Sequence, residues 1–70
     1  MRVQNMVKFI CLTNSKDKSD IYVNINLIVS MKYVDRFRST AINMQNSPSV
    51  WVEELPDAIG RMIDEKNNGP

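Results

Sequence analysis

The segment from Val50 to Ile63 constrains the fold of this chain more than any other. Its first three residues, Val-Trp-Val, belong to a β-rich stretch in which neighbouring side chains point to opposite faces of a sheet. Pro56 suits the first turn of a helix because its φ is fixed, and Asp57 beside it is favoured by the helix dipole. An apolar stripe with helical spacings of four, three and one is formed by Leu55, Ile59, Met62 and Ile63. We therefore expect one strand to lead directly into one amphipathic helix whose stripe lies on a sheet.

The preceding residues predict four further strands joined by turns. β-rich or alternating apolar residues predict strands at residues 7–13, 21–23, 28–34 and 40–45, with the last strand at residues 50–53. The polar run at residues 14–20 predicts the turn of one hairpin, and residues 35–39 predict the tip of a second. Asn24 is expected to start a tight turn between the second and third strands, because its side chain can bond backbone groups two or three residues further on.

These elements predict a small α+β domain. We expect a strongly bent antiparallel sheet of five strands, open or closed as an SH3-like or Sm-like barrel, with one C-terminal helix across an open end or face. The 70 residues make one domain, 1–70, with an ordered core at about 6–65 and loose termini at 1–5 and 66–70. A domain of this size buries only roughly 60% of the surface of its unfolded chain, so self-association is expected to add stability.

The composition argues against several classes of protein. The chain has no histidine and one cysteine, so it lacks an internal disulfide, the commonest zinc ligands and the usual general base near neutral pH. We therefore expect no enzyme activity, no metal and no cofactor. Polar residues interrupt the apolar stretch at residues 25–34, which is too short for a membrane span, and no signal-peptide pattern opens the chain. These features predict a cytoplasmic protein.

The charge is unevenly distributed along the chain. Residues 1–52 hold seven cationic and three anionic side chains, whereas residues 53–70 hold two cationic and five anionic ones. The β part is therefore basic and the helical part acidic. One interpretation is structural, with acids near a helix start and lysines on exposed strands. The other is a basic face that meets an anionic partner.

Two features are candidates for partner binding. Arg36, Phe37 and Arg38, preceded by Lys32 and Tyr33, form a cluster of cations and aromatics that can pair with carboxylates or phosphates and stack on bases. The alternative is a solvated hairpin tip in which Phe37 folds back on the sheet.

Trp51 is the second candidate. Because it alternates with two valines, either the indole or the valines must point away from the helix-covered core. In one alternative, the helix or the N-terminal strand covers the indole. In the other, Trp51 lies at an interface with a partner or a second copy, where tryptophan is enriched. Trp51 and Phe37 are not expected to share one buried face.

Other reactive side chains predict no chemistry. Cys11 has no histidine to activate it and is expected to be a small buried hydrophobe. Glu53 and Glu54 are adjacent, so on a strand they point to opposite faces and cannot act together on one substrate.

The order of elements resembles a known family. The segments that carry the likeness are Phe-Ile-Cys-Leu-Thr-Asn at 9–14, Ile-Tyr-Val-Asn at 21–24 with Leu-Ile at 27–28, Ala-Ile-Asn-Met at 41–44, and Val-Trp-Val-Glu-Glu at 50–54 with Ile59 and Ile63. Over residues 7–63 the chain resembles the small FlbD-type proteins of bacterial flagellar operons and their phage-borne relatives. It departs from their pattern at residues 46–49, Asn-Ser-Pro-Ser, where that family has an Asn-Gly turn, and in its Pro-Asp helix start and Gly60. The resemblance implies a small antiparallel β unit with a C-terminal helix and an accessory, non-enzymatic role.

We therefore expect a small accessory or regulatory protein of bacterial or phage origin. It would act by protein–protein interaction, with a protein partner or with itself as a homo-oligomer. The alternative is a small nucleic-acid-binding β-barrel that uses the Arg36 and Arg38 hairpin, although a sequence pI of 7.9 is low for that class.

Overall fold

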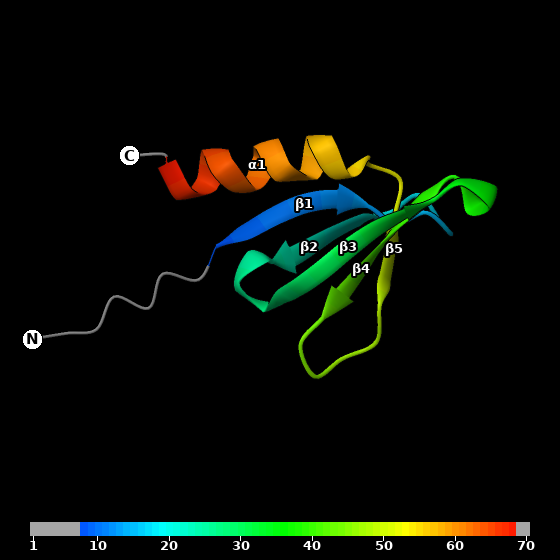
Figure 1. Cartoon of the computed structure of the whole chain (residues 1–70), viewed down its shortest axis with the longest axis horizontal. Helices are drawn as coiled ribbons and strands as arrows, with labels where there is room; N and C mark the ends of the chain where they lie inside the picture. Colours follow the sequence, from blue (N-terminus) through cyan, green and yellow to red (C-terminus); the bar gives the residue numbers. More distant parts are fainter. Residues whose placement is uncertain (1–7, 69–70) are drawn as a thin grey trace, which may run out of the picture.

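The computed structural model describes residues 8–68 and shows five strands followed by one helix (Figure 1). The strands are β1 (Phe9–Thr13), β2 (Asp20–Asn24), β3 (Ile28–Val34), β4 (Ser39–Met44) and β5 (Val50–Val52), and the helix is α1 (Pro56–Asn68). Two 3-10 turns complete the order, η1 (Ile25–Leu27) before β3 and η2 (Asp35–Phe37) before β4. The predicted α+β class, the five strands and the C-terminal helix are confirmed. The loose N-terminus predicted at residues 1–5 lies outside the described residues.

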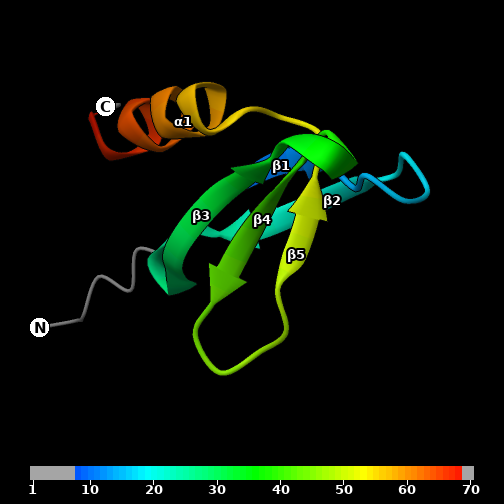
Figure 2. The ribbon, with the colours of Figure 1, turned by 45° about the vertical axis from the view of Figure 1, so that its right-hand side comes forward.

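The strands form two antiparallel sheets. One is the hairpin β1-β2, and the other has the order β3-β4-β5, whose strands lie side by side in Figure 2. A seam joins the sheets where the end of β1 meets β5. Asn14 forms a bridge with Val52, Ser15 N–H donates to the Trp51 carbonyl (3.0 Å), and Glu53 N–H donates to the Thr13 carbonyl (2.9 Å).

The barrel alternative is wrong for the described residues. Paired and bridged strands run in the order β2-β1-β5-β4-β3, and no ladder joins β2 to β3 among residues 8–68. These two strands follow one another through η1, which redirects the chain instead of reversing it into a hairpin. The Asn24 side chain accepts a hydrogen bond from Asn26 N–H (2.9 Å), so the predicted Asn-initiated turn is confirmed. An irregular register between Ile28 and Ser30 then bends the start of β3.

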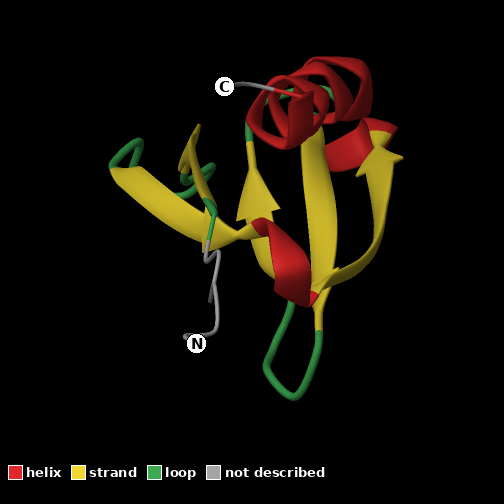
Figure 3. Ribbon diagram, turned by 90° about the vertical axis from the view of Figure 1, so that its left-hand side faces the viewer, coloured by secondary structure: helices red, strands yellow, loops and turns green. Residues whose placement is uncertain are grey.

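The core lies between the two sheets and the helix. Its buried apolar side chains come from β1, β2, β4, β5 and α1, and they are Ile10, Leu12, Val23, Ile42, Val52 and Ile59. The helix lies against β1 and β3 and crosses one end of the strands in Figure 3. Met62 and Ile63 pack on this core at half-buried positions, so most of the predicted stripe is confirmed.

Two details of the helix differ from the prediction. Leu55 is 54% exposed and does not join the stripe. It precedes Pro56, which disfavours helical geometry at the residue before it, so its side chain leaves the line of the helix. The helix also continues to Asn68, beyond the end predicted at residue 65, because no glycine or proline lies between Gly60 and Gly69 and Lys66 favours the last turn.

Candidate partner-binding surface

The three-stranded sheet has one face on the core and one face in solvent. Val52 is completely buried in the core, so Trp51 beside it points to the opposite face. Cross-strand pairing aligns Lys32 of β3 with Ala41 of β4, and Ala41 with Trp51 of β5. These three side chains therefore form one row on the solvent face. Of the alternatives for Trp51, cover by the helix is wrong, because Val52 takes the core position and the half-buried indole lies on the opposite face.

Phe37 and Trp51 contact each other on this outer face. Their ring centroids are 5.5 Å apart with an interplanar angle of 90°, an edge-to-face pair. The guanidinium carbon of Arg36 lies over the Phe37 ring, 5.4 Å from its centroid. Phe37 remains 58% exposed, so it folds back on the sheet and yet stays open to solvent. The two aromatics do share a face, but it is the solvent face.

The hairpin tip that carries Phe37 has an unusual backbone. Arg38 has a φ of 49°, in the left-handed region that glycine or asparagine normally occupies. Its N–H donates to the Asp35 carbonyl (3.1 Å), which closes η2. Ser39 then donates its hydroxyl to the Phe37 carbonyl (2.9 Å). The tip is therefore fixed by local hydrogen bonds, and Arg38 is held exposed at its end.

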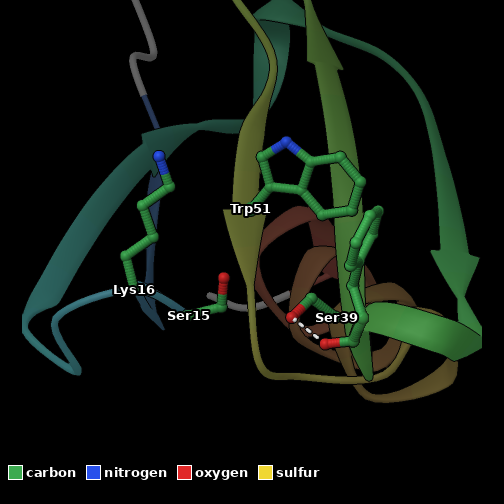
Figure 4. Close-up of a pocket in the computed structure, with 5 residues that line it drawn as sticks. Ser15, Lys16, Ser39 and Trp51 are labelled. Atoms are coloured by element: carbon green, nitrogen blue, oxygen red, sulfur yellow. Dashed lines mark hydrogen bonds between the residues drawn. The ribbon is translucent and has the colours of Figure 1, made fainter.

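A pocket of about 410 Å³ lies beside the aromatic pair (Figure 4). It is lined by Ser39 and Trp51 from the three-stranded sheet, by Phe37 from η2, and by Ser15 and Lys16 from the turn after β1. In Figure 4 the Lys16 side chain extends alongside the indole, with Ser15 between them in this view. The seam brings these two segments together, because Ser15 N–H is bonded to the Trp51 carbonyl.

A second pocket, of about 210 Å³, adjoins the first and shares Lys16 and Trp51 with it. Its other lining residues are Asn14, Ile21, Ser49 and Val50. We call the two pockets together the Trp51 groove. It is bounded by both sheets of the molecule.

The predicted site residues fall into two groups. The first group lies on the solvent face. Lys32 is exposed in the same row as Trp51, Phe37 contacts Trp51, and Arg36 contacts Phe37. Tyr33 alternates with Lys32 and pairs with Thr40, a completely buried residue, so it lies on the opposite face and is half-buried.

Lys16 lies in the groove although its sequence context does not indicate a binding residue. The polar run around it predicts only a solvated turn, and no local signal shows that this turn reaches β5.

One exposed cation, Lys16, lines the Trp51 groove, and three others lie on the same sheet or at the hairpin tip. Within residues 8–68, none of four exposed cations near the groove or at the hairpin tip forms an ion pair; they are Lys16, Lys32, Arg36 and Arg38. Lys18 in the same turn as Lys16 pairs with Glu53. Hydrogen bonds from the side chain and backbone of Ser19 lower the pKa of Asp17, which therefore remains ionised in that turn at neutral pH.

The single cysteine, Cys11, lies on β1. Cys11 is half-buried and not the buried hydrophobe we expected, because Ile10 and Leu12 take the core positions on either side of it. It lies opposite Tyr22, and the Coulombic effect and hydrogen bonding of Cys11 raise the pKa of the Tyr22 hydroxyl.

The two adjacent glutamates separate. Glu53 pairs with Lys18 at the surface, whereas Glu54 accepts hydrogen bonds from Thr13.

Within the described residues, no three of the side-chain types that bind metals lie together. No helix in this part of the chain combines the length and apolar character needed to cross a bilayer.

The fold and the groove define a small α+β protein with a solvent-facing aromatic pair at a seam between two sheets. Comparison of the chain with protein-family models, with curated proteins and with solved structures finds no match. The resemblance to the FlbD-type proteins therefore stays a prediction.

Proposed function

We propose that this protein is a small non-enzymatic accessory or regulatory protein of bacterial or phage origin that acts through protein–protein interaction. The observation that carries the proposal is the Phe37–Trp51 pair on the solvent face of the sheet, with Arg36 over Phe37. Tryptophan and arginine are enriched among the residues that dominate binding energy at protein interfaces. A phenylalanine that is 58% exposed leaves apolar surface in water, which a partner would bury.

The test is the simultaneous change of Arg36, Phe37 and Arg38 to Ser. The Phe37–Trp51 contact contributes about 0.5–1.5 kcal/mol, so the variant should stay folded with a small loss of stability. Binding to a protein captured by the wild-type chain should be lost. Retained binding would place the interaction surface elsewhere on the molecule.

We also propose that the protein self-associates. Among residues 8–68 only six apolar side chains are buried, while eight more are only partly buried around them. Val29, at the free edge of β3, is 67% exposed. Sedimentation equilibrium should show a mass that rises above that of one chain at high micromolar concentration. The mass of a single chain at every concentration would contradict this proposal.

The second candidate function is nucleic-acid binding. It is favoured by the exposed cations around the aromatic pair, since single-stranded nucleic acids bind to aromatic side chains within basic grooves. Titration with mixed-sequence RNA and DNA at several salt concentrations tests it. Affinity that falls steeply with salt would support this function, because phosphate contacts release counterions.

A further inference from the structure

The Trp51 groove offers two neighbouring pockets to a ligand. Its two pockets share Lys16 and Trp51; Phe37 and Ser39 line only the larger pocket, and Asn14 and Ser49 line only the smaller one. Alternate side chains of an extended peptide are about 6.5–7 Å apart and point the same way. Such a peptide can therefore place side chains in both pockets, which a compact ligand in one pocket cannot do.

The groove also has a definite chemistry. The Phe37 and Trp51 rings form an apolar corner at its larger pocket. Lys16 lines both pockets and Arg36 lies on the Phe37 ring, and within the described residues neither forms an ion pair. An apolar side chain next to carboxylates complements this arrangement of rings and cations.

The geometry favours a peptide over nucleic acid. Successive bases of a single strand stack on exposed aromatic faces. The 90° angle between the Phe37 and Trp51 rings makes a corner instead of two parallel faces, and Arg36 lies over the Phe37 ring. A corner of this kind holds one inserted side chain better than a stack of bases.

We propose that the Trp51 groove binds an extended acidic segment of a protein partner. The segment inserts one aromatic or aliphatic side chain into the Phe37–Trp51 corner and pairs its carboxylates with Lys16 and Arg36. This inference rests on the proposed protein-interaction function and names the chemistry of the partner.

The test uses the fluorescence of Trp51, the single tryptophan of the chain. The probe is a short peptide of Asp and Glu residues around one central Phe, blocked at both ends. Three comparison ligands are the same peptide with Ala for Phe, the same peptide with Lys for the acidic residues, and an oligouridylate of equal length. We expect a saturable blue shift of the emission with the probe and binding at least about tenfold weaker for the other three.

Single substitutions locate the binding. Lys16→Ala and Arg36→Ala should each lower the affinity for the probe by about two- to fivefold, as expected for partly exposed ion pairs. Phe37→Ala should lower this affinity by about tenfold or more. The matched control is Arg61→Ala, which removes an exposed cation from α1 and should leave the affinity unchanged. Circular dichroism of each variant checks that it is folded.

Several results would overturn the inference. These are tighter binding of the oligouridylate than of the probe, equal binding of the Phe and Ala peptides, or equal effects of Lys16→Ala and Arg61→Ala. A change in the sedimentation mass with Lys16→Ala would show that a second copy occupies the groove. If the probe fails while the Ser variant of residues 36–38 still loses a captured protein, this inference fails and the proposed function stands.

Discussion

Glu54 holds the two sheets together, and its removal should destabilise the protein far more than removal of its neighbour. Its carboxylate accepts hydrogen bonds from the Thr13 N–H (3.0 Å) and the Thr13 hydroxyl (2.9 Å). Its backbone carbonyl accepts a third from the hydroxyl of Thr40 (2.6 Å), a residue without solvent exposure. The side chain thus ties β1 to the segment that joins β5 to α1.

The magnitude of Glu54→Ala follows from these bonds. Hydrogen bonds to a charged group contribute about 1.5–3 kcal/mol each, and a partly buried N–H left without a partner costs about 1–3 kcal/mol. Partial exposure of the pair reduces these values, so we expect a loss of about 2–4 kcal/mol in the free energy of unfolding. A domain of this length has only about 3–10 kcal/mol in total. Urea denaturation followed by circular dichroism measures the difference.

Glu53→Ala is the matched control. Glu53 pairs with Lys18, and the two side chains are 39% and 65% exposed, so the pair contributes about 0–1 kcal/mol. Glu54→Gln should be intermediate, because its amide retains one acceptor for Thr13. If Glu54→Ala costs no more than Glu53→Ala, the hydrogen bonds to Thr13 do not hold the sheets together.

Three further predictions concern the helix and the hairpin tip. Gly60→Ala should raise stability by about 0.5–1 kcal/mol in urea denaturation, because an added Cβ meets nothing within 4 Å, and a loss would contradict this reasoning. Ile59→Asp should unfold the domain, because it places a charge at a completely buried position. The control Arg61→Ala should change stability by no more than about 0.5 kcal/mol. A native-like thermal melt for Ile59→Asp would show that the helix does not dock on the sheets. Arg38→Gly should stabilise the protein by about 1 kcal/mol because it relieves a left-handed φ, and an unchanged or lower denaturation midpoint would refute that strain.

The fold was largely predictable because most of its elements are specified locally. The Asn24 side chain and Pro56 each act on neighbouring backbone, so the turn before β3 and the start of α1 appear where the sequence predicts them. The exposure of Leu55 also has a local cause, since this residue precedes a proline. Helical spacing alone does not take that proline into account, so it assigned Leu55 to the apolar stripe. Whether β2 pairs with β3 depends on how η1 directs the chain in three dimensions, and residue spacing does not specify that direction.

The candidate site was predictable only in part. Alternation along a strand separates Lys32 from Tyr33, and the sequence contains that information. The contact of Phe37 with Trp51 depends on the registers of β3 with β4 and of β4 with β5, which pair residues distant in sequence. The approach of Lys16 depends on the seam between the sheets. Both relations are long-range, and short residue patterns carry no signal for them.

The position of the groove links binding to stability. Lys16 lies in the turn after β1, whereas Trp51 belongs to the three-stranded sheet and Phe37 to the tip between β3 and β4, so a ligand in the groove would contact segments from both sheets. Such a ligand binds only when the seam is closed, and a ligand that binds only the closed, folded form stabilises it by mass action. The hydrogen bonds from Thr13 to Glu54 lie at the same seam. A weakened seam should therefore lower affinity for a partner before it unfolds the domain, and a bound partner should restore part of the stability that Glu54→Ala removes.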